Sequence, residues 1–467
     1  MKKVLWVCIA LLIILPLIMG CTPAAEPGTV ETPKATQKEP TPVTPGESDN
    51  GIDPNKSYEV VFWHHESPDH RVAAFDRIIG MFTDKYPNVK LRQEIVGWGE
   101  ATSKLFAAVE AGQAPDFQFG IPDLMITCYN AGIILPVTDV VEEVNSQYKI
   151  YDDILGMYKY QDQYWGLPVA TMPFALAYRP SILQQFGYSE PPKTWDEMLA
   201  MAKDITERGK GDVYGIGLGG GRNLFVDEQA YMFMASRGAK FFNEDGSIAF
   251  NSPETVEVLK YYKELYQYSP VGSDAWMWGE IEMNLAAGVC AMAPYLPSIQ
   301  IRMNDMDLDD LGFAQMPLYK EGAKPGSLTY PNDIVVFTQC EERGNLAVVK
   351  EFMKFMMQPE VNVNFTSGME PGGFIPCTEA AAKYEGYWNN PIIQRYLDVN
   401  KEAVKTLEYS SLYGFEYGHW VNNGIGEIVG GNVLSATLSK VLTNEMTPEE
   451  AAAWGAQEME KLSKPLK

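Results

Sequence analysis

The sequence predicts an α/β protein built on a parallel, doubly wound sheet. Between residues 58 and 119, short runs rich in β-branched and aromatic residues alternate with segments whose apolar residues recur at helical spacing. Later parts of the chain carry helix-start signals and short apolar runs of the same two kinds. Because a strand, a crossover helix and a second strand form a parallel pair, we expect helices on both faces of the sheet.

The first elements follow from local patterns. Tyr58 begins a β-rich run with little polar alternation, as in a strand buried on both faces. Apolar residues at helical spacing follow, and Pro87 should end that helix. A second helix should close at Gly112. The predicted order is a strand at 58–63, a helix over 72–82, a strand at 89–95, a helix over 101–111 and a strand at 116–119.

Three later helices have explicit start signals. Thr194 and Glu197 have the spacing of a capping box. At Ser252, a capping residue stands directly before a Pro in the first helical position, and Thr447 combines both signals. Helices should begin at all three places. The best further strand candidates are residues 174–178 and 334–337.

Composition and charge narrow the possible functions. The chain has 467 residues, 46% hydrophobic and 21% charged, which suits a globular protein of two or three domains. Asp and Glu total 61 against 37 Lys and Arg, a formal net charge of -24. With no sequence-wide positive field to hold a phosphate backbone, we expect no nucleic-acid partner. Four His and six Cys are too few for a dense metal or disulfide scaffold.

The amino terminus has the pattern of an export signal. Two Lys precede an apolar run that ends at Met19, and Gly20 and Cys21 follow. The run is broken by Pro16 and is shorter than the roughly twenty apolar residues of a retained membrane helix. A Cys at this place resembles the lipobox of bacterial and archaeal lipoproteins. The resemblance implies a signal peptide over 1–20 and lipidation of Cys21.

A tether is expected after this Cys. Residues 22–50 contain six Pro, several Thr and Glu, and no aromatic residue. Such a segment cannot bury enough apolar surface to offset its chain entropy, so we expect residues 21–57 to be a disordered, Pro/Thr-rich tether. The working part is then a body over residues 58–467, held by lipid on the extracytoplasmic side of the cell membrane.

Seven stretches of the body resemble, in order, the stretches of one family. They are Phe82–Val89, Lys104–Asp116, Tyr164–Pro168, Ala177–Pro180, Pro191–Glu197, Ala286–Met292 and Ala347–Glu360. Each is weak alone, but the order holds across nearly all of residues 58–467. On these stretches the body resembles the family-one extracellular solute-binding proteins of ABC importers, the group of the maltose-binding protein.

The resemblance implies two doubly wound lobes joined by a hinge with three crossings, as in type II periplasmic binding proteins. One lobe would hold residues 58–168 and 334–408, and the other 169–333 and 409–467. A small solute would bind in the cleft, and the closed protein would dock on a permease driven by ATPase subunits. We therefore expect a monomer without catalytic residues, cofactor or bound metal.

The ligand expected from the resemblance is a carbohydrate. Sugars present flat CH patches and rims of hydroxyls, so their sites pair aromatic faces with planar polar side chains. Trp63, His64 and Glu66 stand at the end of the first strand, where polar side chains contact sugar in similar proteins. Tyr295 and Trp420 match two aromatic positions of maltodextrin-binding relatives. For each aromatic, packing in the core is the alternative.

Further candidates lie in the expected cleft loops. Asn332 and Asp333 stand at a crossover where many relatives are glycine-rich, which would put an acid at the cleft wall. Arg222 and Asn223 follow the glycine-rich stretch 215–221, which lacks the Lys-Ser or Lys-Thr of a phosphate loop. The remaining loop aromatics are Trp98, Trp276 and Trp278.

Two other patterns were weighed. His64, His65 and His70 with Glu66 could form a metal cluster, but adjacent strand residues point to opposite faces, so no metal is expected. The body has four Cys, which allow three complete pairings. We expect Cys290 to be free, and a pairing of Cys340 with Cys377 stays open. The remaining one is Cys128.

The leading hypothesis is a lipid-anchored protein that binds a carbohydrate, most simply an oligosaccharide, for an ABC importer. Glu66 and Asp333 keep open a cationic solute such as an amine or an amino sugar. An exported glycoside hydrolase would also use aromatics and paired carboxylates, but nothing in the resemblance supplies a positioned acid and base. A surface receptor or adhesin on the same fold is the third class.

Overall fold

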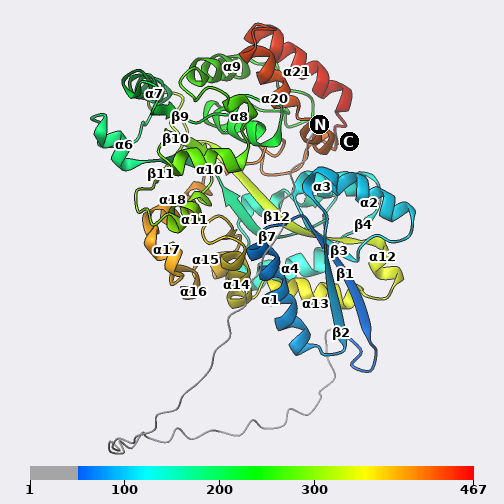
Figure 1. Ribbon diagram of the computed structural model, residues 1–467. Helices are drawn as coiled ribbons and strands as arrows, with labels where there is room; N and C mark the ends of the chain where they lie inside the picture. Colours follow the sequence, from blue (N-terminus) through cyan, green and yellow to red (C-terminus); the bar gives the residue numbers. More distant parts are fainter. Residues whose placement is uncertain (1–50, 467) are drawn as a thin grey trace, which may run out of the picture. The chain divides into compact units, whose positions relative to one another are not determined.

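The computed structural model describes residues 51–466, and Figure 1 shows its ribbon. The predicted signal peptide, Cys21 and most of the predicted tether lie outside these residues. Within 51–466, no helix is both long and apolar enough to cross a membrane. The strands form an eight-stranded sheet, a four-stranded sheet and a two-stranded hairpin.

The first sheet begins with the unit that the sequence predicts. β1 (Tyr58–His64) lies between β2 (Val89–Ile95) and β3 (Phe117–Gly120) and pairs with both in parallel. The crossovers are α1 (Asp69–Lys85), which buries its apolar stripe, and α2 (Ala101–Glu110). The three strands and two helices predicted between residues 58 and 119 are confirmed.

The rest of this sheet is joined to that unit through antiparallel pairs. β12 (Ser327–Phe337) pairs with β3 and with β7 (Leu167–Pro173) in antiparallel fashion, and all its residues are buried. It includes the strand predicted at 334–337 and extends it toward the amino end. The register shifts between Asn332 and Asp333, as at a β-bulge. The sheet is therefore mixed, with the order β13-β7-β12-β3-β1-β2.

A smaller sheet lies above the first in Figure 1. β8 (Ala175–Tyr178) follows β7 after a single residue and pairs antiparallel with β10 (Cys290–Tyr295) and β11 (Gly312–Ala314). β9 (Tyr214–Ile216) completes the sheet in parallel with β10. The strand predicted at 174–178 is thus confirmed as β8, and the step from β7 to β8 carries the chain directly from one sheet to the other.

The three helices with explicit start signals begin where the sequence predicts. They are α7 (Trp195–Gly209), α9 (Pro253–Tyr266) and α21 (Pro448–Leu462). In each, the side chain before the first turn accepts a hydrogen bond from the backbone N–H of the third helical residue. The capping signals are therefore confirmed.

Shorter and intervening elements complete the described chain. The helices are α3 (Pro122–Asn130), α4 (Thr138–Tyr148), α5 (Asp152–Gly156), α6 (Pro180–Gln185), α8 (Leu224–Arg237), α10 (Trp278–Ala286), α11 (Ile299–Asp305), α12 (Thr338–Glu342), α13 (Leu346–Met356), α14 (Pro359–Met369), α15 (Glu379–Ala382), α16 (Glu385–Trp388), α17 (Pro391–Arg395), α18 (Leu397–Thr406), α19 (Ile425–Gly430) and α20 (Val433–Leu442), with 3-10 turns at Trp98–Glu100 and Ser273–Ala275. The strands are β4 (Ile134–Leu135), β5 (Lys159–Tyr160), β6 (Gln163–Tyr164), β13 (Ile375–Pro376) and β14 (Ser410–Ser411).

The segment from 391 to 406 packs on the second sheet. α18 buries Val399 and Ala403 and packs against β11, while α17 contacts α11. Residues 391–406 were expected in the lobe of the first sheet, but α18 and α17 contact β11 and α11. The reason is the apolar face of α18, which packs mainly against β11 and also contacts β7 of the first sheet.

All four cysteines of the described residues are buried and free. Cys340 lies in α12, beside the end of β12, whereas the Cys377 thiol donates to the carbonyl of Pro168 at 3.2 Å, next to β7. The pairing of Cys340 with Cys377, left open by the sequence, is therefore wrong, and Cys290 is free as expected.

Candidate ligand-binding site

The carboxyl end of β1 is enclosed within the first sheet. Trp63 is 8% exposed, and its Nε1 donates to Glu94 Oε2 at 2.7 Å. His64 is fully buried, with its Nε2 at 2.9 Å from Gln93 Oε1 and its ring stacked on Phe75. Burial lowers the pKa of His64, which favours the neutral ring. Both candidate ligand contacts thus have partners on β2 and α1.

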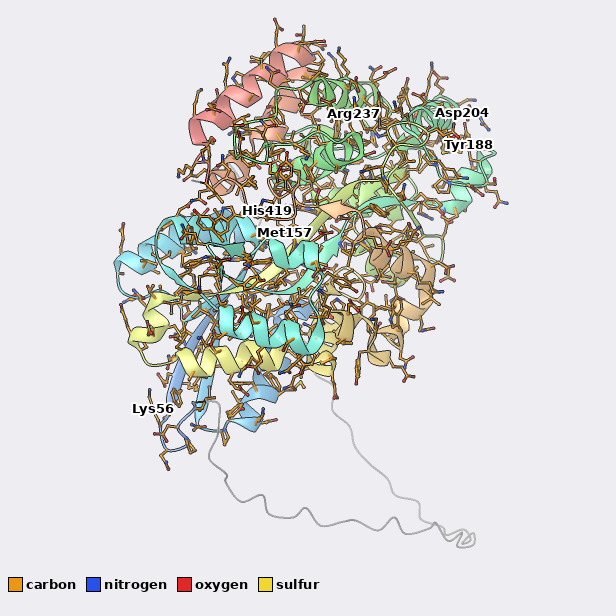
Figure 2. The ribbon with its side chains drawn as sticks, turned by 180° about the vertical axis from the view of Figure 1, so that it is seen from behind. Lys56, Met157, Tyr188, Asp204, Arg237 and His419 are labelled. Carbon is orange, nitrogen blue, oxygen red and sulfur yellow. The ribbon has the colours of Figure 1, made fainter. Side chains whose placement is uncertain are left out.

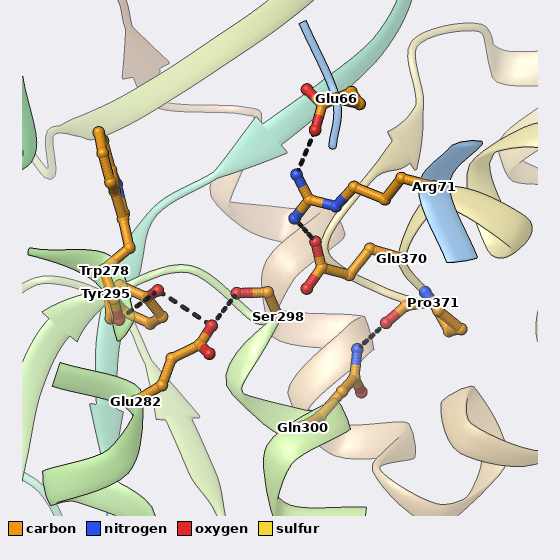
Figure 3. Close-up of polar contacts among 9 residues, drawn as sticks. All are labelled: Glu66, Arg71, Trp278, Glu282, Tyr295, Ser298, Gln300, Glu370 and Pro371. Carbon is orange, nitrogen blue, oxygen red and sulfur yellow. Dashed lines mark hydrogen bonds and ion pairs between the residues drawn. The ribbon is translucent and has the colours of Figure 1, made fainter. Parts of the chain in front are cut away.

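A charged cluster lies just beyond this point. Glu66 Oε2 accepts from one Nη of Arg71 at 2.6 Å, and the other Nη of Arg71 donates to Glu370 (Figure 3). Glu66 and Glu370 are both buried, while Arg71 is only partly buried. We call these three residues the charged wall. It joins the end of β1, the start of α1 and the loop after α14.

The charged wall holds two carboxyls against one guanidinium. Burial works to lower the pKa of Arg71, but the carboxylates of Glu370 and Glu66 raise it above its ordinary value. Burial raises the pKa of Glu370 to about 7, although the charge of Arg71 acts in the opposite direction. The wall therefore carries a carboxyl whose pKa lies well above that of an exposed glutamate.

An aromatic cluster belongs to the second sheet. Tyr295, at the end of β10, donates its hydroxyl to Glu282 Oε1 at 3.0 Å, and Ser298 Oγ donates to the same oxygen at 3.1 Å. The Trp278 indole donates to Glu228 Oε2 at 2.8 Å. Burial raises the pKa of Glu228 to about 8. We call Glu228, Trp278, Glu282, Tyr295 and Ser298 the aromatic wall.

The two walls lie near each other, as Figure 3 shows. The carboxyl of Glu282 acts with burial to raise the pKa of Glu370, and Glu370 acts likewise on the hydroxyl of Tyr295. Beside them, Gln300 Nε2 donates to the carbonyl of Pro371 at 2.5 Å and joins the two sides directly. Tyr295 and Trp278 are thus the sequence-predicted aromatics that the fold brings opposite Glu66.

Gly372 permits the close approach at Gln300. Its φ is +73°, and a Cβ on it would come within 1.8 Å of Gln300 Nε2. Asn400 also donates to Gln300 Oε1 at 2.8 Å. The contact between the loop after α14 and α11 therefore depends on a glycine, both for its backbone conformation and for space.

Asn332 and Asp333 lie inside the first sheet, at the bulge of β12. Both are buried, and neither oxygen of Asp333 has a hydrogen bond of ordinary geometry among the described residues, although the Tyr158 hydroxyl interacts with this carboxyl. Burial raises the pKa of Asp333 well above its ordinary value, with a smaller contribution from Asp123. The expected acid is thus buried in the first sheet, where burial disfavours its charged form, and Asn332 donates only a long 3.5 Å bond to the carbonyl of Gly120.

A chain of hydroxyls joins β12 to α3. Tyr330 donates to Asp123 Oδ1 at 2.8 Å, and Tyr413 donates to the Tyr330 hydroxyl at 3.0 Å. Burial raises the pKa of Asp123 to about 6. Because Tyr413 belongs to the segment after β14, this chain ties the first sheet to the carboxyl-terminal part of the molecule.

Trp420 packs between aromatic rings of the first half of the chain. Its ring centroid lies 5.0 Å from that of Tyr129 and 5.0 Å from that of Tyr160, and only 3% of its surface is exposed. Its Nε1 donates to Asn423 Oδ1 at 2.9 Å. Trp420 therefore joins the carboxyl-terminal segment to α3 and β5, and in this structure both its ring and its N–H are already engaged.

The remaining candidates have separate places. Arg222 is exposed and donates to the carbonyl of Gly431 at 2.7 Å. Asn223 caps α8 by accepting from the backbone N–H of Val226. Trp276 is buried, whereas Trp98 is 42% exposed and lies against the ring of His65. The structure does not bring these four side chains into the two walls.

Sequence reasoning missed most of the polar residues of the two walls. Arg71 lies in the first turns of α1, and its partner Glu370 is 299 positions away along the chain. Glu282 lies on α10, most of whose residues are not buried, and Glu228 lies within α8, most of whose residues are buried. Of these missed residues, only Glu228 gave a signal in the sequence. It is an acid within the apolar segment that forms α8, and a buried acid requires a partner.

The arrangement suits the binding of a hydroxylated solute. Carboxyl oxygens accept hydrogen bonds, and the indole and phenol rings offer flat apolar faces. Within residues 51–466, no group of three or more His, Cys, Asp or Glu residues is placed to hold a metal ion.

Comparison with known proteins identifies the family. The profile of bacterial extracellular solute-binding proteins matches residues 68–363, more than half of the chain. The chain belongs to this family. Its members are solute-binding proteins rather than enzymes, and the resemblance found in the sequence is confirmed.

Relatives of known name cover most of the chain. The ABC transporter periplasmic-binding protein YcjN of Escherichia coli is 23% identical over 390 residues, 82% of this chain and 87% of the relative. A maltotriose-binding protein of Pyrococcus abyssi is 23% identical over 351 residues, 72% of this chain and 70% of the relative.

Solved structures share the fold. An ABC transporter solute-binding protein from Thermotoga lettingae, bound with α-D-tagatose, has a TM-score of 0.72 at 22% identity and covers 87% of this chain and 100% of its own. The maltose-bound MalE3 of T. maritima has a TM-score of 0.71 at 18% identity, with the same coverage. The predicted fold class, an α/β protein of two lobes like the periplasmic binding proteins, is confirmed.

Proposed function

We propose that this protein captures a carbohydrate, most simply an oligosaccharide, between the charged wall and the aromatic wall. The observation that carries the proposal is the opposition of Trp278 and Tyr295 to the Glu66–Arg71–Glu370 cluster. Relatives named for maltotriose and arabinooligosaccharide binding support the class of ligand. On this proposal the ligand hydroxyls bond to the carboxyls, and a ring face covers the sugar CH groups.

Binding closes the two lobes in this proposal. One lobe comprises 58–168 and 334–408 without α17 and α18, and the other comprises 169–333 with α17, α18 and 409–467. Ligand contacts from both sides stabilise the closed population. The Gln300–Pro371 and Tyr330–Asp123 bonds and the packing of Trp420 join the two lobes, and we expect these contacts to break when the ligand-free protein opens.

Delivery to a permease follows from the same proposal. The relatives include binding proteins named for ABC transporters, so the partners are permease subunits with their ATPase. We further propose that the mature chain acts as a monomer and is held at the extracytoplasmic side of the cell membrane by lipid on Cys21. Globomycin-sensitive processing and labelling with a radioactive fatty acid test the anchor, and a Cys21→Ser variant should lose the label.

An amine or amino sugar is the second candidate ligand. The observation that favours it is the excess of acids, because the two walls contain four carboxyls and one guanidinium, that of Arg71, which pairs with Glu66 and Glu370. A protonated amine could take a place between Glu282 and Glu370, whose charges already act on each other.

A thermal-shift screen tests both candidates. The purified protein is heated with mono- and oligosaccharides in one set and with polyamines, amino acids and phosphate esters in another. A ligand that binds only the folded state raises the melting temperature by mass action. We expect a rise with one saccharide group and no turnover of it. A rise with amines alone would reject the carbohydrate, and turnover of a saccharide would indicate a hydrolase.

A further inference from the structure

A cavity lies apart from the two walls. Its volume is about 410 Å³, within the range of roughly 300–1,000 Å³ typical of small-molecule sites. Met157, which follows α5 and is labelled in Figure 2, lines one side. Tyr231 of α8 and Ser411 of β14 line others. No residue of the charged wall or the aromatic wall is among those that line it.

The cavity is bounded by segments from distant parts of the chain. Ser410 and Ser411 pair with the start of β12, which fixes one side. Gly156 and Gly418 meet at another, where a Cβ on Gly156 would come within 1.9 Å of the Gly418 carbonyl oxygen. The walls of the cavity are therefore held by a strand pair and a close backbone contact, so the space is part of the fold.

Glu416 supplies an unused acceptor at this cavity. Its Oε1 accepts from the backbone N–H groups of Gly414 at 3.0 Å and Phe241 at 3.2 Å. Its Oε2 is buried and accepts no hydrogen bond of ordinary geometry among the described residues, although the Tyr231 hydroxyl, which bonds with Ser411, lies close enough to interact with this carboxyl. Burial raises the pKa of Glu416 to about 7, opposed in part by the charge of Lys240. A buried carboxyl oxygen without a donor is costly, and a bound hydroxyl would satisfy it.

The other lining groups are aromatic or hydroxyl-bearing. Tyr231 and Ser411 share a hydrogen bond of 2.9 Å. The ammonium of Lys240 lies 3.7 Å from the ring centroid of Tyr417, so its charge is already placed over a ring. The lining thus combines ring faces, hydroxyls and one unsatisfied acceptor, with acidic and basic groups both present.

We propose that this cavity is a second binding site, for a small neutral polyhydroxylated solute of about monosaccharide size. Ring faces cover its CH groups, Glu416 Oε2 accepts one of its hydroxyls, and the serine hydroxyls bond to others. The site does not depend on the proposed function, because none of the wall residues contributes to it.

Titration calorimetry with glycerol, D-glucose and myo-inositol as probes tests the proposal. We expect at least one of them to bind the purified protein, and to bind the Trp278→Ala variant equally well. The Ala235→Leu variant fills the cavity from a helical position and should weaken that binding at least tenfold. The Glu416→Gln variant should weaken it about fivefold, while Glu244→Gln, at an exposed acid, should not change it.

Three results would overturn this site. One is the absence of binding by all three probes. Another is loss of probe binding in Trp278→Ala, which would place the probes between the walls and leave the proposed function intact. The last is binding of putrescine, offered as the cationic probe, in place of the neutral ones. If Ala235→Leu does not fold, judged by its melting temperature, the Glu416→Gln result decides.

Discussion

The charged wall and the aromatic wall both contain two acids, but they neutralise them differently. In the charged wall, Glu66 and Glu370 share the guanidinium of Arg71. In the aromatic wall, Glu228 and Glu282 accept only from neutral donors, an indole N–H and two hydroxyls. The first arrangement pairs its charges within the protein, although the buried Nε of Arg71 has no hydrogen-bond partner among the described residues. Neutral donors can be exchanged for those of a ligand at little electrostatic cost.

This difference predicts that substitutions in the charged wall act mainly on the stability of the fold, and that substitutions in the aromatic wall act mainly on ligand binding. Removing the cation of the charged wall leaves two buried acids without compensation, so its main effect should be on folding. Removing a ring or a hydroxyl from the aromatic wall takes away a surface that a sugar can use, so its main effect should be on binding. The predictions below test this division, beginning with the largest expected effect.

The pH dependence of stability compares the acids of the two walls. In the folded protein the pKa is about 8 for Glu228 and about 7 for Glu370, both above the ordinary 4.5. At a pH between 4.5 and these raised pKa values, the two carboxyls hold protons in the folded protein that they have released in the unfolded chain. The free energy of unfolding should therefore fall as pH rises, by about 6 kcal/mol from pH 5 to pH 8 for the two acids together.

Urea unfolding at several pH values measures this slope. Glu228→Gln should flatten it more than Glu370→Gln, because the shift at Glu228 is the larger. Stability that increases from pH 5 to pH 8 would contradict the assignment of protonated acids to the walls.

Arg71→Ala should destabilise the fold by about 2–4 kcal/mol. Breaking a fully buried ion pair costs about 3–5 kcal/mol, and Arg71 retains 22% exposure of its side chain, which reduces the effect. Denaturant unfolding at pH 7 measures it. The matched control is Lys90→Ala, whose pair with Glu59 is exposed on both sides and should contribute little. Equal losses in the two variants would show that the charged wall has no special structural role.

Trp278→Phe should destabilise the fold by about 1–2 kcal/mol more than a matched Trp→Phe change elsewhere. The substitution keeps a ring but leaves the buried Glu228 without its donor. Trp195→Phe is the control, because the Trp195 indole N–H is buried and has no partner among the described residues. If both variants lose the same stability, the bond from Trp278 to Glu228 contributes nothing.

Tyr295→Phe should have the smallest effect on stability, about 1 kcal/mol, through loss of its bond to Glu282. The matched control is Tyr387→Phe, since the buried Tyr387 hydroxyl has no partner within residues 51–466. That control should be neutral or slightly stabilising. Calorimetric melting of the two variants measures the difference, and a greater loss in Tyr387→Phe would reverse the interpretation.

The sequence predicted the local elements well. Capping residues and apolar spacing act over a few positions, so Thr194, Ser252 and Thr447 mark helix starts that the structure confirms. The mixed character of the first sheet was not predictable in this way. β12 is buried along its whole length, and a continuous apolar run does not tell parallel from antiparallel pairing.

The site was predictable only in part. Tyr295 and Trp278 lie in the aromatic wall and Glu66 lies in the charged wall, and their contact with a ligand stays a prediction. His64 did not, because adjacent strand residues point to opposite faces and the ring of His64 points to α1. Arg71 was missed because its partner Glu370 is brought close only by the tertiary fold.

The central claim is that a carbohydrate is bound between the two walls. The most direct test is the dissociation constant of the saccharide that gives the largest thermal shift, measured by titration calorimetry on the wild-type protein and on Trp278→Ala. Loss of a ring that stacks on sugar should weaken binding by about 1–3 kcal/mol, roughly 5- to 150-fold. Equal dissociation constants for the two proteins would contradict the account and place the ligand elsewhere.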